Sequence, residues 1–161
     1  MDDDDFDALF FAHASRLVRL ARLLGAADPE DVVQEAFAKV YAARHRLDDQ
    51  TRTVPYLNRV VVNEVRDRHR RSSVARRDAH LLVVRDQHLP AFDTGDRSAV
   101  LAELRALPPR QREALVLRYW LDLPLAAIAD AMGVREGTVK SQISRGLATL
   151  QAALRDEEDG R

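Results

Sequence analysis

The chain of 161 residues contains no cysteine, which excludes disulfide bridges and thiolate metal sites. Its five histidines, at positions 13, 45, 69, 80 and 88, show no ligand spacing such as His-Glu-x-x-His. The sequence also lacks a phosphate-binding loop, a nucleophile elbow and a convergent acid and base pair. We therefore expect no metal, no other cofactor and no catalytic residues, and we predict that the protein is not an enzyme.

Long hydrophobic runs are also missing. No segment approaches the length of a membrane span, and the acidic N-terminus has no apolar targeting core. We therefore expect a cytoplasmic protein without membrane insertion. Lysine is scarce, with only Lys39 and Lys140 against abundant arginine and alanine, a composition typical of a GC-rich bacterium.

The formal net charge of -1 gives the whole chain no attraction for nucleic acid, but the charges are sorted along the sequence. Residues 1–35 hold nine acidic side chains against three arginines, whereas residues 56–77 hold seven arginines against two acidic side chains. The N-terminal segment therefore repels phosphate, and the central segment attracts it.

The most informative segment is 104–150, in which two helical patterns meet at a glycine. The first helix is predicted over about 125–132, and Gly133 ends it because glycine adopts the left-handed conformation at little cost. The second helix is predicted to start near Glu136 and carries an apolar stripe at Val139, Ile143, Leu147, Leu150 and Leu154. This arrangement is that of a helix-turn-helix.

The opposite face of the second helix carries hydrogen-bond donors and cations. Such side chains suit the major groove of DNA, where a helix fits and base edges accept hydrogen bonds. The candidate DNA-binding residues on this helix and its approach are Arg135, Thr138, Lys140, Ser141, Gln142, Ser144 and Arg145. The alternative is a helical hairpin with a solvated face, since helix–glycine–helix segments also occur in plain bundles.

The rest of the chain shows helical periodicity without strand-like alternation. Residues 9–24 form one apolar stripe, and Asp28 before Pro29 is typical of a helix N-cap. A second helix is predicted over about 32–41, a loop over 44–54, and a third helix from Pro55. We predict an all-α protein in which two small helical domains, residues 1–71 and 98–161, are joined by a linker over 72–97.

Three segments together resemble a known family. DPEDVVQEAFAKVYAAR (28–44), VPYLNRVVVNEVRDRHRR (54–71) and LPPRQREALVLRYWLDLPLAAIADAMGVREGTVKSQISRGLATL (107–150) resemble the two conserved regions of an extracytoplasmic-function, or group IV, sigma factor of bacterial RNA polymerase. The resemblance lies within the sigma-70 superfamily and points to its actinobacterial sigma-E-like group. It implies promoter recognition, DNA opening and transcription initiation, without enzymatic chemistry of its own.

The resemblance also implies partners. The family docks on the clamp helices and flap of the RNA polymerase core, and the matching exposed positions of the second helix are Asp31, Gln34, Glu35 and Lys39. By chemistry alone, this cluster is also typical of a solvated acidic face. Promoter DNA and an anti-sigma protein are the other expected partners.

In the family, the N-terminal region holds a single strand of the minus-ten element. Such binding needs a cationic track and planar rings on which bases stack. The matching residues here are Tyr56, Asn58, Arg59, Asn63, Arg66, Arg70 and Arg71. The family commonly has tryptophan where this chain has Tyr56 and an aromatic residue where it has Asn58, and Tyr56 is equally compatible with a core position.

The resemblance assigns the helix-turn-helix to the minus-thirty-five element. Arg110, Arg112 and Arg118 are expected to add contacts to the DNA backbone, whereas Tyr119 and Trp120 are expected to belong to the core. The alternative function is a stand-alone helix-turn-helix transcriptional regulator. That alternative leaves the acidic helix at 28–44 and the arginine-rich helix at 55–71 without a purpose.

Overall fold

The computed structural model describes residues 1–47, 50–78 and 96–160, and within these residues it contains helices and no strands. This agrees with the predicted all-α class. No helix in the described ranges is long and apolar enough to cross a membrane.

The N-terminal helices are α1 (Asp3–Leu23), α2 (Pro29–Ala43) and α3 (Gln50–Asp78), with a short 3-10 turn, η1 (Arg44–Arg46), after α2. The Asp28 carboxylate accepts a hydrogen bond from the backbone N–H of Asp31 at 3.2 Å, and Pro29 occupies the first turn of α2. The predicted N-cap is therefore confirmed. It satisfies a backbone donor that the first turn of a helix leaves free.

Helix α3 is longer than predicted at both ends. It begins at Gln50 instead of Pro55, so the predicted loop over 44–54 is wrong for residues 50–54. Pro55 is tolerated because it lies early in the helix, where its missing N–H removes only one intrahelical hydrogen bond. The helix also continues through residues 72–78, which the sequence suggested were linker. Of the remaining predicted linker, residues 79–95 lie outside the described residues, and residues 96–97 already belong to the next helix, which begins at Asp96.

The C-terminal helices are α4 (Asp96–Ala106), α5 (Pro109–Leu115), α6 (Leu125–Met132) and α7 (Glu136–Asp159), with a π-helical turn, η2 (Val116–Trp120), after α5. Helix α6 has the predicted bounds. It ends at Gly133, whose φ of 67° lies in the left-handed region. The predicted helix-turn-helix geometry is therefore present.

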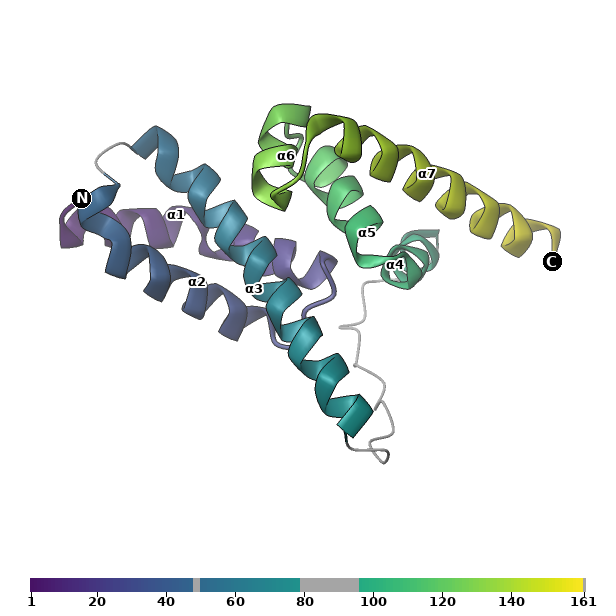
Figure 1. Cartoon of the computed structure of the whole chain (residues 1–161), viewed down its shortest axis with the longest axis horizontal. Helices are drawn as coiled ribbons and strands as arrows, with labels where there is room; N and C mark the ends of the chain where they lie inside the picture. The colour runs from purple at the N-terminus through teal and green to yellow at the C-terminus, as the bar shows by residue number, and fades with distance from the viewer. Residues whose placement is uncertain (48–49, 79–95, 161) are drawn as a thin grey trace.

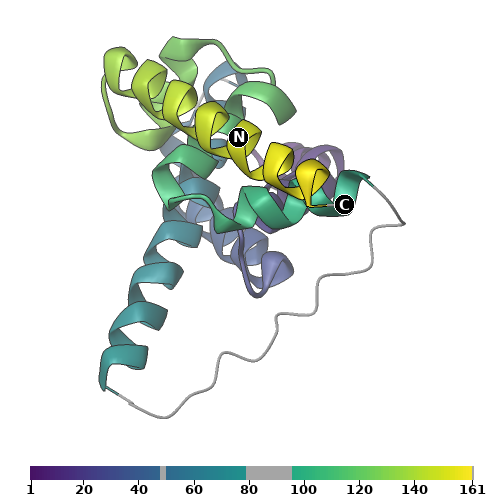
Figure 2. The same ribbon diagram turned by 90° about the vertical axis from the view of Figure 1, so that its right-hand side faces the viewer.

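The two groups of helices pack against each other. In Figure 1, α3 crosses α1 and α2 on one side and lies beside α6 on the other, while its C-terminal end extends away from the bundle. Figure 2 shows α7 crossing in front of the other helices. One core cluster contains buried apolar side chains from α1, α2, α3, α5, α6 and α7.

Two aromatic residues depart from the expected core. Tyr119 is 62% exposed and Trp120 is 38% exposed, so their assignment to the core is wrong. They are the last two residues of the π-helical turn, whose first two residues, Val116 and Leu117, are buried in the core instead. An extra residue in the turn changes which side chains face inward.

Candidate nucleic-acid interface

The predicted recognition helix presents its polar face to solvent. Val139 is fully buried and Ile143 packs against the core, so α7 is anchored by its first two turns. The polar candidates are exposed except for the half-buried Gln142: Arg135, Thr138, Lys140, Ser141, Ser144 and Arg145. Lys140 and Arg145 form no ion pair within the described ranges. Both cations are therefore available to a ligand.

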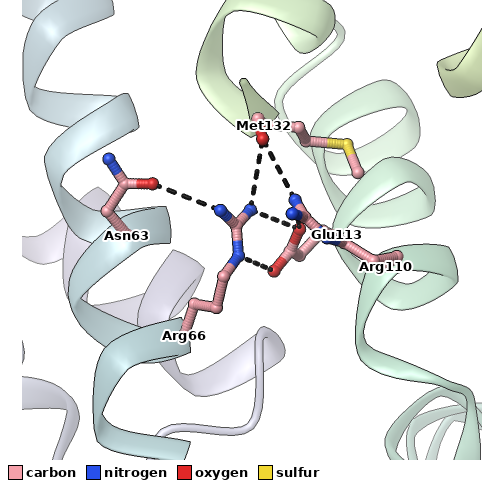
Figure 3. A network of polar contacts seen from close by, with 5 residues as sticks. All are labelled: Asn63, Arg66, Arg110, Glu113 and Met132. Carbon is pink, nitrogen blue, oxygen red and sulfur yellow. Dashed lines mark hydrogen bonds and ion pairs between the residues drawn. The ribbon is translucent and has the colours of Figure 1, made fainter. Parts of the chain in front are cut away.

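The arginine face of α3 is already occupied. Arg66 donates two hydrogen bonds to the Glu113 carboxylate, from Nε at 3.2 Å and from Nη2 at 2.8 Å, in a bidentate arrangement. Its Nη1 lies 3.4 Å from Asn63 Oδ1, and its Nη2 lies 3.5 Å from the Met132 carbonyl oxygen. Figure 3 shows this guanidinium between α3 and the C-terminal helices. All three of its nitrogen atoms have partners.

Arg110 approaches the same acceptors from the other side. Its Nη1 lies 3.0 Å from the Met132 carbonyl oxygen and 3.4 Å from Glu113 Oε2 (Figure 3). Met132 is the last residue of α6, so its carbonyl belongs to the negative end of the helix dipole. Two guanidinium groups thus share one carboxylate and one helix C-terminus.

A second ion pair joins the same surfaces, between Arg59 Nη1 and Asp130 Oδ1 at 3.8 Å. Residues 59, 62, 63 and 66 share one face of α3 because they are spaced by three and four positions. Val62, in the middle of that face, is 1% exposed. The C-terminal helices therefore cover this face.

The other minus-ten candidates have different positions. Arg70 and Arg71 are exposed, and Arg71 reaches Glu64 only at 4.0 Å. Tyr56 is half-buried and packs against the core cluster. Asn58 is 4% exposed and its Oδ1 has no hydrogen-bond partner. Asn58 therefore does not share the cationic face, because the periodicity of α3 turns it inward.

Helices α2 and α3 are joined by a buried carboxylate. Glu64 is 2% exposed and accepts hydrogen bonds from Lys39 Nζ at 2.6 Å and Arg68 Nε at 3.0 Å. Burial alone raises the pKa of this carboxyl, but the hydrogen bonds and charges of Lys39 and Arg68 outweigh it and hold the pKa below its ordinary value. Arg68 also pairs with Asp31 at 2.7 Å.

The proposed docking positions on α2 are exposed, but they are not equivalent. Asp31 and Lys39 are held by partners on α3, whereas Gln34 and Glu35 form no ion pair or hydrogen bond that reaches another helix in the described part of the chain. Gln34 borders a hollow between α1 and α2 that is lined by the aromatic rings of Phe6, Phe10, Phe37 and Tyr41. The surface around these positions is therefore acidic, polar and aromatic.

The position of Arg112 differs from the one expected for a residue that contacts the DNA backbone. It is 9% exposed, and its guanidinium donates to four backbone carbonyl oxygens, those of Leu24, Leu104, Arg105 and Leu107. Burial lowers its pKa from the ordinary value, an effect that the nearby Glu113 opposes and Arg105 adds to. Arg112 therefore holds the ends of α1 and α4 together, and the expected contact with the DNA backbone is wrong for it.

The acidic partners in this interface were not singled out from the sequence. Glu113 lies one residue after Arg112, and Asp130 lies within the first helix of the helix-turn-helix. Asp130 interrupts an otherwise apolar eight-residue helix, which is the one local signal that marks it. Nothing in the sequence pairs Glu113 with Arg66, 47 positions away, or Asp130 with Arg59.

Comparisons with known proteins identify the family. A model described as "Sigma-70 region 2" matches residues 9–74, and one described as "Sigma-70, region 4" matches residues 97–150. The chain belongs to the sigma-70 family. It is an RNA polymerase sigma factor, which directs promoter recognition, DNA opening and transcription initiation, and it is therefore not a stand-alone regulator.

Individual relatives of this sigma factor include actinobacterial ones. The chain is 29% identical to an RNA polymerase sigma-E factor of Streptomyces coelicolor, covering 93% of this chain and 86% of the relative. It is 34% identical to the extracytoplasmic-function sigma factor SigM of Mycobacterium tuberculosis, covering 92% and 76%. Among solved structures, the sigma factor RpoE bound to the anti-sigma factor NepR from Bartonella quintana has the same fold, with a TM-score of 0.80, 23% identity, and coverage of 94% and 97%.

Proposed function

We propose that residues 1–71 dock on the RNA polymerase core and hold the minus-ten element, and that residues 98–161 bind the minus-thirty-five element, with 72–97 as the linker. The observation that carries this proposal is the presence of two cationic faces and one acidic face on separate helices. The cationic faces lie on α7 and α3, and the acidic face lies on α2. The protein acts in the cytoplasm and carries no catalysis of its own.

The minus-thirty-five contact is assigned to the exposed face of α7. Lys140 and Arg145 suit phosphates or guanine edges, because guanidinium and ammonium groups donate to both. Ser141, Ser144 and Gln142 supply shorter donors and acceptors. This assignment is supported by the absence of an ion-pair partner for either cation in the described part of the chain.

The minus-ten contact is assigned to Arg59, Asn63, Arg66, Arg70 and Arg71 on α3, which form a cationic track for a single strand. Tyr56 offers one partly exposed ring for stacking, whereas the buried Asn58 offers none. With so few stacking surfaces, we expect the free protein to hold single-stranded DNA weakly, because each stacked base contributes roughly 1–3 kcal/mol.

An anti-sigma protein is the third proposed partner. Solved structures of related fold include a sigma factor bound to an anti-sigma factor. Here a groove between α1 and the C-terminal helices has an apolar lining and arginines along its edge, which suits an amphipathic segment with carboxylates. Its lining includes Leu101, Leu104, Leu147, Leu150, Tyr119 and Trp120, and the arginines are Arg19, Arg22 and Arg105.

The docking proposal is tested by reversing charge on α2. Glu35→Lys changes an exposed carboxylate that has no partner on another helix, so the fold should be retained. We expect it to reduce co-purification with core polymerase at least tenfold, and Gln34→Lys together with Glu35→Lys to abolish it. Asp31→Lys is a less clean test, because it also removes the ion pair with Arg68.

The matched control is Glu157→Lys, which reverses one exposed carboxylate near the end of α7. It changes the net charge by the same amount as Glu35→Lys alone and should leave core binding intact. Core binding by the α2 double variant at the wild-type level would show that α2 is not the docking face. Run-off transcription with purified core tests the promoter-directed function itself.

A further inference from the structure

A polar hollow lies where four segments of the chain meet: the turn between α1 and α2, the C-terminal part of α3, the end of α4 and the start of α5. Its volume of about 300 Å³ is at the lower end of the range for small-molecule sites. The polar side chains that line it are His69, Ser72, Ser73, Arg105 and Arg112. Among the described residues, no carboxylate belongs to this lining. We call it the basic hollow.

Arg105 contributes a cation without a counter-ion to the basic hollow. Its guanidinium is half-buried and forms no ion pair or hydrogen bond within residues 1–47, 50–78 and 96–160. Burial and, to a smaller extent, the nearby charge of Arg22 lower the pKa of Arg105 from its ordinary value. Both effects disfavour the charged form, so an anion held beside this guanidinium would relieve them.

Arg112 contributes a second cation, which is fixed in position and has a donor to spare. A guanidinium carries five N–H groups, and Arg112 uses four of them on backbone carbonyl oxygens. None of these acceptors is a carboxylate. The adjacent Glu113 is already engaged by Arg66 and Arg110. The charge of Arg112 is therefore stabilised by carbonyl dipoles and is not neutralised by an ion pair in the described part of the chain.

Helix α3 adds neutral donors to the other side of the basic hollow. Ser72 and Ser73 are exposed, and their hydroxyl groups have no hydrogen-bond partner among the described residues. The His69 ring is held by its Nε2, which lies 3.0 Å from the Gly25 carbonyl oxygen. Because a carbonyl oxygen only accepts hydrogen bonds, Nε2 is the donor there. Guanidinium groups and hydroxyl groups together form the kind of donor set that binds phosphate oxygens.

We propose that the basic hollow binds a small anion that carries a phosphate or pyrophosphate group, with Arg105 and Arg112 as its charged donors and Ser72 and Ser73 as its neutral donors. The proposal goes beyond the promoter-directed function and does not depend on it. Burial argues for a small ligand, because Arg112 is only 9% exposed. A free anion can enter the hollow to reach it, whereas a phosphate of a DNA duplex is held on a broad surface.

The test is isothermal titration calorimetry of the full chain with sodium pyrophosphate at constant ionic strength, so that general screening does not change. We expect saturable binding at one site and a higher melting temperature with ligand, because a ligand that binds only the folded protein stabilises it. Arg105→Ala should weaken binding by about tenfold or more, since it removes charged hydrogen bonds. Its guanidinium has no partner in the described protein, so the fold should be retained. The matched control Arg155→Ala removes the same charge from an exposed position on α7 and should leave the affinity unchanged.

Ser73→Asp provides a second variant, which places a carboxylate in the lining of the basic hollow. Ser73 is exposed, so the substitution should not disturb folding, which circular dichroism checks. The new carboxylate should compete with pyrophosphate for Arg105 and reduce the affinity by about tenfold or more. Ser15→Asp, at an exposed position on α1, adds the same charge elsewhere and is the matched control.

The proposal is overturned if wild-type protein shows no saturable binding of pyrophosphate, or if the control variants lose as much affinity as Arg105→Ala and Ser73→Asp. It is also overturned if pyrophosphate does not bind while Arg105→Ala weakens binding to duplex DNA, because the hollow would then serve a DNA phosphate. A parallel titration with adenosine diphosphate distinguishes the two sources of the phosphate group. Tighter binding of the nucleotide assigns the site to a phosphate ester, and tighter binding of pyrophosphate assigns it to the inorganic anion; both support the site.

Discussion

At the scale of single residues, buried charges hold the helices of this sigma factor in register. Arg112 has only backbone carbonyls for partners, and they come from the ends of α1 and α4. Glu64 has the opposite chemistry, a buried carboxylate between Lys39 and Arg68. A buried charge without hydrogen-bond partners costs free energy. Each of these two side chains therefore fixes the position of the groups that hydrogen-bond to it.

The first prediction concerns Glu64→Gln. The folded-state pKa of Glu64 is lowered from 4.5, so its ionised form stabilises the fold above that pH and the contribution is lost as pH falls through the folded pKa. At pH about 7, the variant should lose roughly 1–3 kcal/mol of unfolding free energy, the range for hydrogen bonds to charged groups. Urea denaturation at about pH 7 and pH 3 measures this, and an equal loss at both values would contradict the assignment to the carboxylate charge.

The second prediction compares two glycines with positive φ. A Cβ at Gly25 would lie 2.6 Å from Arg112 Nη1, whereas a Cβ at Gly133 would meet nothing within 4 Å. Gly133→Ala should therefore cost only the left-handed strain, roughly 1–2 kcal/mol. Gly25→Ala should cost roughly 2–4 kcal/mol, because it also disturbs the bond from Arg112 to the Leu24 carbonyl.

Thermal unfolding of the two glycine variants side by side checks this difference. Equal losses in free energy would show that Arg112 moves aside without cost. The comparison is informative because both variants add the same methyl group at a residue whose φ is positive.

At the scale of elements, local signals predicted the C-terminal helices better than α3. Gly133 is a strong helix boundary, and it lies at the predicted end of α6, just before the predicted start of α7. Pro55 is a weaker boundary, because a proline is tolerated early in a helix, and the packing of α3 on both α2 and α6 extends the helix beyond it. Tertiary packing, which sequence periodicity does not contain, decided the bounds of α3.

In the candidate site, too, local periodicity predicted some features and tertiary packing decided the others. Exposure of the α7 candidates followed from their opposition to Val139 and Ile143. The inward turn of Asn58 also follows the 3.6-residue period, yet the family resemblance placed it on the DNA face. Pairing of Arg66 with Glu113 spans 47 positions and depends on how the two groups of helices meet. No local pattern contains that information.

The third prediction tests the two faces of α7. Arg145→Ala should weaken binding to the minus-thirty-five element by roughly 1–3 kcal/mol and relax preference at one base pair, if Arg145 reads a base edge. Val139→Ala, on the buried face, should instead lower the unfolding free energy by roughly 2 kcal/mol, since it deletes two methyl groups from a packed site. Holoenzyme binding to duplex variants and urea denaturation measure the two effects.

The two variants act as controls for each other. Uniform weakening on every sequence, with the salt slope reduced by about one, would assign Arg145 to a phosphate instead of a base. Loss of stability in Arg145→Ala without loss of binding would show that the faces are reversed.

At the scale of the whole molecule, the net charge and the ion pairs between the two groups of helices both weaken the attraction for DNA. The net charge is -1, so long-range attraction to DNA is absent. The α3 face is neutralised from within by Glu113 and Asp130. Unpaired or weakly paired cations remain on α7 and on the C-terminal half of α3. A free chain of this kind has little with which to hold a promoter.

The fourth prediction follows from this balance. At physiological salt, the free protein should bind promoter DNA no more tightly than ordinary non-specific binding, with a Kd of roughly 10⁻⁶ M or weaker. The holoenzyme should bind the same promoter specifically, with a Kd of roughly 10⁻⁸ M or tighter, if core polymerase presents the α3 and α7 faces to the promoter together. Fluorescence anisotropy on one labelled promoter, with and without core, measures both values. Nanomolar and sequence-specific binding by the free chain would contradict the dependence on core polymerase, because it would mean that α3 and α7 bind their elements without a partner.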